Sequence, residues 1–233
     1  MSPRLRVLGV LASALLAGGC QTLRQQPPHL SGATHWYRDS AEAHAIYQQT
    51  YHAAEQSVRM RAAGLRPRSW AVILDVDETV LDNSEYQKEL DLAGMDYTES
   101  TWNQWVARGA AVPLPGAAGF TSAVRQMQGQ VILVTNRSQA QCPVTEENLR
   151  KTGIPFDRLL CQTGTEDKNP RFRSVQEGTS EGTAPLQVLA WVGDNIGDFP
   201  GLSQDKYDPG EFGTHFFMLP NPLYGSWEGN PAK

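Results

Sequence analysis

Four short apolar runs, separated by segments of helical or loop character, constrain what this chain can fold into. They are Trp70–Leu74, Val131–Val134, Arg158–Cys161 and Val188–Val192, and His215–Leu219 is a candidate for a fifth. A run that is apolar at almost every position needs protein cover on both faces, which is typical of a buried strand in a parallel sheet. Between two of the runs, residues 143–152 predict a crossover helix, closed by a glycine. Strands that alternate with helices predict an α/β domain, a three-layer sandwich around a central parallel sheet.

Polar residues follow three of these runs at the point where each strand should end. Asp75 and Thr135 come directly after an apolar run, and Asp194 follows another run after a single glycine. In an open α/β sheet the ligand site lies at the carboxyl edge of the strands. We therefore expect three separate strands to deliver oxygen-bearing side chains to one functional site.

The first of these positions begins an Asp-x-Asp pair, Asp75 and Asp77. If the backbone stays extended, the two carboxyl groups point the same way, roughly 6–7 Å apart. A phosphoryl group fits between them. One carboxylate can attack phosphorus, while the other, when protonated, gives a proton to the leaving oxygen on the opposite side. The pair therefore favours phosphoryl transfer through a covalent aspartyl-phosphate.

A site with this much negative charge needs cations. Asp194 and Asp198 offer the hard oxygen ligands that suit Mg²⁺, and Lys168 is a candidate for holding a phosphate oxygen. Purely structural roles are the alternative: the two aspartates could cap a helix start, and the lysine could be a solvated surface residue. A calcium loop fits poorly, since Val80 and Tyr86 stand where that loop needs glycine and an acid.

Four segments together resemble the motifs of the haloacid dehalogenase superfamily. They are Asp75–Ser84, Val134–Arg137, Lys168 and Val192–Phe199. More narrowly, the sequence resembles the class C acid phosphatases, which are bacterial lipoproteins with four signature aspartates. The similarity runs from about residue 36 to residue 228. One departure is the stretch between Lys168 and Asp194, which is longer than is usual in that family.

The resemblance implies a role for each matched residue. Asp75 is the nucleophile, and Asp77 is the acid/base whose backbone carbonyl also binds metal. The implied phosphate-binding residues are Thr135, Asn136 and Lys168, and the implied Mg²⁺ site consists of Asp75, Asp77, Asp194 and Asp198. Asp198 also supports Lys168. Arg137 matches the second motif, with its task left open. The family further implies a small helical cap, formed here by an insertion at roughly residues 83–115, and a homodimer.

Two aromatic residues bear on the substrate. Trp102 and Tyr224 match positions that sandwich the aromatic part of the substrate in this family. Such stacking contributes about 1–3 kcal/mol per base in other systems, although most tryptophans serve in core packing instead. The resemblance thus implies an acid phosphatase that hydrolyses 5′-nucleoside monophosphates and aryl phosphates. A different enzyme on the same scaffold, a relative without catalysis, and a lipoprotein that binds nucleotides or other aromatic ligands without turnover are the alternatives.

The N-terminus predicts export. Arg4 and Arg6 precede a short apolar stretch and then small residues up to Cys20, an order typical of secretory signals. Although Ala17 replaces the usual leucine, the pattern resembles a bacterial lipoprotein signal. We expect a signal peptide at residues 1–19, lipidation of Cys20, a tether at residues 20–34 and one folded domain at 35–233, anchored to the outer membrane.

Two further observations restrict the partners and the compartment of this protein. The formal charge of −5 and the lack of a dense run of Lys or Arg make a nucleic acid polymer an unfavourable partner. A small phosphorylated substrate needs only a few local cations. In an exported protein Cys142 and Cys161 could form a disulfide, and two buried free thiols are the equal alternative, because geometry decides.

Overall fold

The computed structural model describes residues 29–180 and 182–231, so the predicted signal peptide and Cys20 lie outside the described part. The predicted tether, residues 20–34, overlaps the first helix, α1 (Gly32–Asp39), in which Thr34 is fully buried. Ser31 caps this helix by accepting a hydrogen bond from the Thr34 N–H at 3.1 Å. The folded domain therefore includes residues that we had assigned to the tether.

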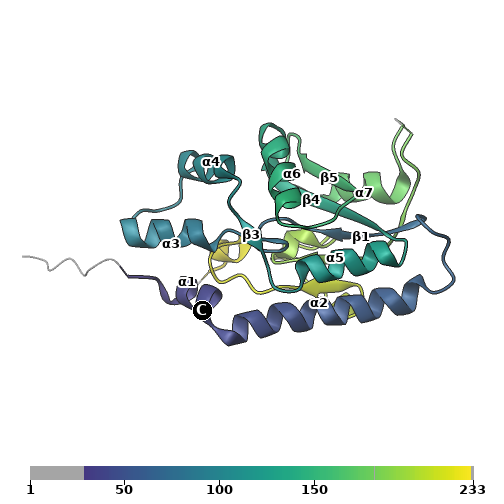
Figure 1. Cartoon of the computed structure of the whole chain (residues 1–233), viewed down its shortest axis with the longest axis horizontal. Helices are drawn as coiled ribbons and strands as arrows, with labels where there is room; N and C mark the ends of the chain where they lie inside the picture. The colour runs from purple at the N-terminus through teal and green to yellow at the C-terminus, as the bar shows by residue number, and fades with distance from the viewer. Residues whose placement is uncertain (1–28, 181, 232–233) are drawn as a thin grey trace, which may run out of the picture.

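A five-stranded parallel sheet forms the centre of the molecule (Figure 1). Its strands are β1 (Trp70–Leu74), β4 (Gln130–Ser138), β5 (Arg158–Gln162), β6 (Gln187–Gly193) and β7 (Phe216–Met218). They lie in the order β5-β4-β1-β6-β7, and each neighbouring pair is parallel. All five predicted strands, including the candidate fifth, are confirmed, and β1 lies in the middle of the sheet.

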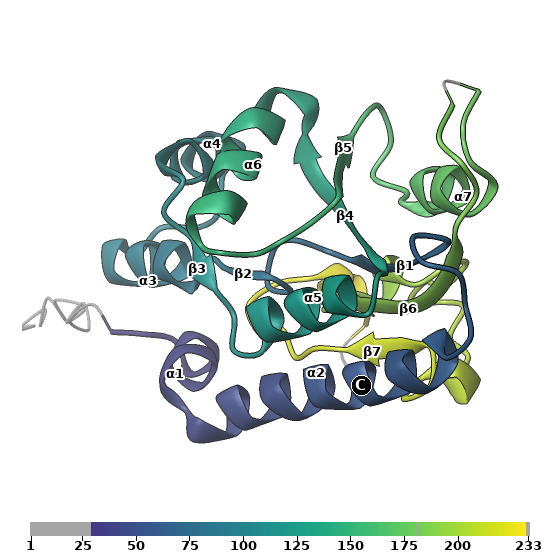
Figure 2. The same cartoon turned by 45° about the vertical axis from the view of Figure 1, so that its right-hand side comes forward.

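Helices cover both faces of this sheet, which gives the predicted three layers (Figure 2). The flanking helices are α2 (Ala41–Ala62), α5 (Ala117–Gln126), α6 (Cys142–Lys151) and α7 (Asn169–Glu177). Alternate residues of β1 enter two separate cores: Val72 and Leu74 pack with α2, α5 and α6, whereas Ala71 and Ile73 pack with α7. Because both cores are apolar, β1 is held firmly from both sides and its end is fixed in position.

A small helical cap occupies the predicted insertion and stands at one end of the sheet (Figure 1). It consists of α3 (Ser84–Ala93) and α4 (Glu99–Arg108), and it is closed by the antiparallel pair β2 (Leu81–Asp82) and β3 (Val112–Pro113). The remaining elements are short 3-10 helices at Gln139–Gln141, Ile196–Asp198, Pro209–Glu211 and Ser226–Gly229. Helix α1 braces the cap, because Arg38 donates to Glu85 at 2.7 Å and the Ser31 N–H donates to Asp91 at 2.8 Å.

The two cysteines of the folded domain form a disulfide and are not free thiols. Cys142, the first residue of α6, is bonded to Cys161 in β5, with the two Cα atoms 6.0 Å apart. The bond thus joins β5 to the helix that follows the carboxyl end of β4. Within residues 29–180 and 182–231, no helix has the length and apolar character to cross a membrane.

Candidate active site

The register of the sheet brings the predicted strand-end residues to one edge. Leu74 of β1 pairs with Leu133 of β4 on one side and with Val192 of β6 on the other. The residues that follow, Asp75, Thr135 and Asp194, therefore lie at neighbouring strand ends. The Asp75 N–H donates to the Val192 carbonyl at 3.0 Å, which fixes the backbone of the predicted nucleophile.

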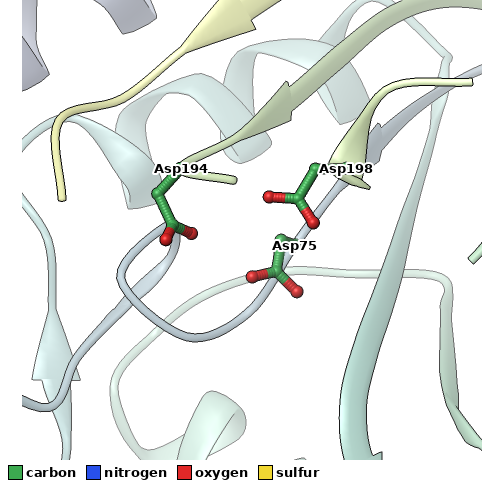
Figure 3. Close-up of side chains that lie close together, drawn as sticks. All are labelled: Asp75, Asp194 and Asp198. Carbon is green, nitrogen blue, oxygen red and sulfur yellow. The ribbon is translucent and has the colours of Figure 1, made fainter. Parts of the chain in front are cut away.

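Three carboxyl groups converge at this edge (Figure 3). Asp75, Asp194 and Asp198 each have an oxygen within 4.8 Å of the others. Asp198 can come this close because Gly193 lacks a Cβ, which would otherwise collide with the Asp198 side chain. Asp75 follows β1, and Asp194 and Asp198 follow β6, so two of the three strand ends expected from the sequence supply the carboxylates of this cluster.

Lys168 lies between two of the carboxylates. Its Nζ is 2.5 Å from Asp75 Oδ1 and 2.6 Å from Asp198 Oδ1, and its side chain is only 6% exposed. Burial by itself lowers the pKa of Lys168, but Asp198 and Asp75 outweigh it and raise that pKa, so the ammonium stays charged. Lys168 is thus a buried part of the site and not a solvated surface lysine.

The single positive charge of Lys168 does not neutralise the negative charge of the carboxylates around it. Burial, followed by the charge of Asp198, raises the pKa of Asp194 to about 7, although hydrogen bonds from Asn221 and Thr79 act in the opposite direction. Burial likewise raises the pKa of Asp75, and Lys168 opposes this shift. A close set of buried carboxyl oxygens short of positive charge is the donor set that a hard divalent cation prefers. The residues therefore fit a divalent metal.

Asp198 has a supporting position within this set. Its Oδ1 accepts from Lys168, and its Oδ2 accepts from the Asn195 N–H at 2.8 Å. Asp194 is held by Thr79 and Asn221, whose donors lie 2.9 Å from its two oxygens. Asp198 thus orients Lys168, as the resemblance implies.

Asp77 is held by a buried arginine. Arg137 Nε donates to both carboxylate oxygens of Asp77 at 3.0 and 3.1 Å, and Nη2 donates to Oδ1 at 2.7 Å. The remaining donor, Nη1, lies 3.2 Å from Thr145 Oγ1, and the Arg137 side chain is only 1% exposed. Because Nε and Nη2 both donate to its carboxylate, Arg137 positions Asp77.

Glu78, next to Asp77, shapes the loop. It is fully buried with a φ of 51°, a left-handed conformation that a non-glycine residue rarely adopts. Its carboxyl group accepts from the Asn83 N–H at 2.8 Å and from the Tyr224 hydroxyl. Burial, followed by the charge of Asp77, raises the pKa of Glu78 well above its usual value. From helix α2, Tyr51 donates to the carbonyl of Thr79 at 2.7 Å, which fixes the same turn.

The other predicted residues occupy different positions. Thr135 is fully buried and its Oγ1 accepts from the Arg137 N–H at 3.1 Å. Asn136 is exposed, and its Oδ1 accepts from Arg171 at 2.6 Å. This hydrogen bond joins Asn136 to Arg171 and not to the carboxylate cluster, so its phosphate contact stays a prediction.

Both predicted aromatic residues lie near the loop that carries Asp77 and Glu78, Trp102 through Arg137 and Tyr224 by direct contact. The half-buried ring of Trp102 is 5.6 Å from the Arg137 guanidinium carbon. Tyr224 is 37% exposed, and its hydroxyl contacts Glu78. Contact with a substrate stays a prediction for both rings.

Sequence reasoning missed the residues that hold Asp77 and its loop. Asn83 and Glu78 lie inside the first motif without a predicted role, Arg137 matches the second motif without a predicted task, and no prediction is made for Trp105 from the sequence. For Asn83 the sequence signal is its place inside the first motif, because a polar side chain needs protein partners only where the fold buries it.

The comparisons with known proteins agree with this geometry. The family described as HAD superfamily, subfamily IIIB (acid phosphatase), matches residues 22–227. The chain belongs to this family. A class C acid phosphatase from Bacillus anthracis is 30% identical, with a TM-score of 0.77 over 84% of this chain and 85% of that chain. A second structure of that enzyme, with tungstate bound, is 29% identical with a TM-score of 0.75 and the same coverage.

Curated plant proteins are also similar to this subfamily IIIB member. A stem 28 kDa glycoprotein of Glycine max is 28% identical over 154 residues, and acid phosphatase 1 of Solanum lycopersicum is 27% identical over 161 residues. Each alignment covers 65% of this chain but only 58% and 57% of the respective relative. The chain thus spans less than two thirds of the length of these curated relatives.

The raised pKa of Asp194 predicts an unusual pH dependence of stability for the metal-free protein. The pKa of Asp194 is about 7 in the folded state, whereas that of an aspartate in the unfolded chain is about 4. Between these values the folded state binds more protons, so the free energy of unfolding falls as pH rises. Thermal unfolding in EDTA should therefore occur at a lower temperature at pH 7 than at about pH 5.

Two controls sharpen this measurement. Saturating divalent metal should remove most of the pH effect, because the bound cation replaces the proton. Asp194→Asn should reduce the effect in EDTA. A metal-free wild type that becomes more stable between about pH 5 and pH 7 would contradict the sign.

Proposed function

We propose that this chain is a magnesium-dependent phosphomonoesterase that forms a covalent aspartyl-phosphate at Asp75. The observation that carries the proposal is the contact of a buried lysine with a strand-end carboxylate, Lys168 Nζ to Asp75 Oδ1 at 2.5 Å, beside two further aspartates. Family membership and the acid phosphatases of known structure support it. Tungstate, bound in one of those structures, is a tetrahedral oxyanion like phosphate.

Each residue has a task in the proposed reaction. An oxygen of Asp75 attacks phosphorus and forms the new P–O bond while the bond to the leaving oxygen breaks. Asp77 gives its proton to that leaving oxygen and then, as a carboxylate, takes a proton from the water that hydrolyses the acyl-phosphate. Lys168 places its charge beside Asp75, where phosphoryl oxygens gather negative charge.

Magnesium belongs to this proposal. Asp75 and Asp194 would hold it through side-chain oxygens and Asp77 through its carbonyl, with Asp198 in support, as the family resemblance implies. When bound, Mg²⁺ supplies neutralisation of the charge on the phosphoryl group. The hard oxygen donors and the proton affinity of Asp194 support this choice.

The first test is phosphate release from a 5′-nucleoside monophosphate by the domain without residues 1–20. Asp75→Asn should lower release by about 10³-fold or more, because the nucleophile is lost. EDTA should abolish release and Mg²⁺ should restore it. Asp205→Asn, at an exposed position, is the matched control and should behave as wild type. Tight binding of the nucleotide without release by wild type would instead favour a binding lipoprotein.

We also propose that the substrate carries an aromatic group, as 5′-nucleoside monophosphates and aryl phosphates do. Trp102 supports this proposal, because its ring is partly exposed on the cap and packs near Arg137, which in turn contacts Asp77. Trp102→Leu should lower kcat/KM for an aryl phosphate by about tenfold, since stacking contributes on the order of 1–3 kcal/mol. The loss for glycerol phosphate should be much smaller, and equal losses for both substrates would contradict stacking.

Finally, we propose export and anchoring to the outer membrane through lipid on Cys20. The disulfide between Cys142 and Cys161 supports an oxidising compartment. In a Gram-negative host, Cys20→Ser should move the protein from the membrane fraction to the soluble exported fraction, and an unchanged membrane fraction would contradict the lipid anchor. The homodimer that the resemblance implies is part of the same proposal, and light scattering of the soluble domain tests it.

A further inference from the structure

Asn83 connects the loop that carries Asp77 and Glu78 with the cap. It is only 2% exposed and stands directly after β2, where the cap insertion begins. Its side-chain Nδ2 donates to Asp77 Oδ1 at 2.8 Å and lies 3.3 Å from Glu78 Oε2. Its Oδ1 accepts from Trp105 Nε1 at 2.8 Å and from Arg137 Nη2 at 3.2 Å. Every hydrogen-bonding group of this amide therefore has a protein partner.

The partners fix which way the amide faces. Trp105 Nε1 and the Arg137 guanidinium can only donate, so they must meet the oxygen of Asn83. The carboxylate of Asp77 can only accept, so it must meet the amide nitrogen. Trp105 is a buried residue of cap helix α4. The cap thus determines the orientation of a side chain that holds the proposed acid.

The two oxygens of Asp77 are held unequally. Oδ1 accepts from Arg137 Nε at 3.0 Å, from Arg137 Nη2 at 2.7 Å and from Asn83 Nδ2 at 2.8 Å. Among the described residues, Oδ2 accepts only from Arg137 Nε, at 3.1 Å. An oxygen with three N–H donors has no room for a proton of its own, so a proton on Asp77 must reside on Oδ2.

We propose that Asn83, oriented by Trp105, is a positioning residue that fixes Asp77 Oδ1 and thereby assigns Oδ2 as the atom that delivers the proton to the leaving oxygen. This inference rests on the proposed phosphatase function and adds to it the residues that aim the acid. It also links acid and cap. Helix α4 carries both Trp105 and the predicted substrate contact Trp102. One helix therefore positions the ring that contacts the leaving group and, through Asn83, the carboxyl group that protonates it.

The dependence of kcat/KM on the leaving group distinguishes a misplaced acid from a general loss of activity. Phenyl phosphate and 4-nitrophenyl phosphate are similar in size, but nitrophenolate is the far better leaving group and depends little on protonation. Asn83→Ala should lower kcat/KM for phenyl phosphate about tenfold or more, and for 4-nitrophenyl phosphate by much less, since general acid catalysis contributes about 10²–10⁴-fold. The ratio of kcat/KM values reports the step in which the leaving group departs, so slow hydrolysis of the intermediate does not mask it.

A milder variant keeps the test decisive if Asn83→Ala does not fold. Trp105→Phe removes one N–H donor to Asn83 and keeps a ring in the buried position, so it should shift the same ratio in the same direction by about twofold to tenfold. Trp191→Phe is the matched control, because Trp191 Nε1 is buried with no hydrogen-bond partner among the described residues. It should leave the ratio unchanged.

The outcomes separate this inference from the function on which it rests. Wild type that hydrolyses both esters, with Asn83 and Trp105 variants that lose phenyl phosphate hydrolysis selectively, supports the inference. Folded variants that lose both activities equally, or neither, overturn it while the phosphatase function stands. Wild type that hydrolyses neither ester overturns the proposed function and this inference together.

Discussion

The contact of Lys168 with Asp75 and Asp198 is the interaction on which the site depends. Three carboxyl groups at one buried edge repel one another and lose hydration, and the cation between two of them offsets part of that cost. Lys168 has little freedom, because it directly precedes helix α7 and is itself buried. The chain thus supplies one fixed positive charge where a phosphoryl group needs several, and a divalent cation fits the remaining deficit.

The two catalytic carboxylates of the proposed reaction differ in what holds them. Asp75 continues the central strand, and both cores fix its backbone. Asp77 lies on a turn with a left-handed residue, and it is held by Arg137 and by Asn83 at the start of the cap. The nucleophile therefore belongs to the rigid sheet, whereas the acid depends on where the cap sits. A division of this kind lets the sheet keep one chemistry while the cap adapts to the leaving group.

The sequence predicted the parts that follow from local pattern. Apolar runs such as Trp70–Leu74 predict buried strands, and the polar residues that follow three of these runs predict the site edge, because parallel strands end together. Partners across the fold are not local, so the burial of Arg137 against Asp77 and the place of Trp105 beside Asn83 could not be derived. A motif can mark such residues without saying what they contact.

Two other features needed three-dimensional geometry. The disulfide depends on the distance between Cys142 and Cys161, which lie 19 positions apart in the sequence. The start of the domain was placed too late, because Ser31 is an N-cap in a segment whose polar composition favours a tether.

The most direct test of the central claim is to mix the soluble domain with excess 4-nitrophenyl phosphate and Mg²⁺, quench in acid and identify the modified peptide by mass spectrometry. We predict one phosphoryl group on Asp75, absent in Asp75→Asn; turnover without any phosphoryl-enzyme, or with the label on another residue, would contradict the account.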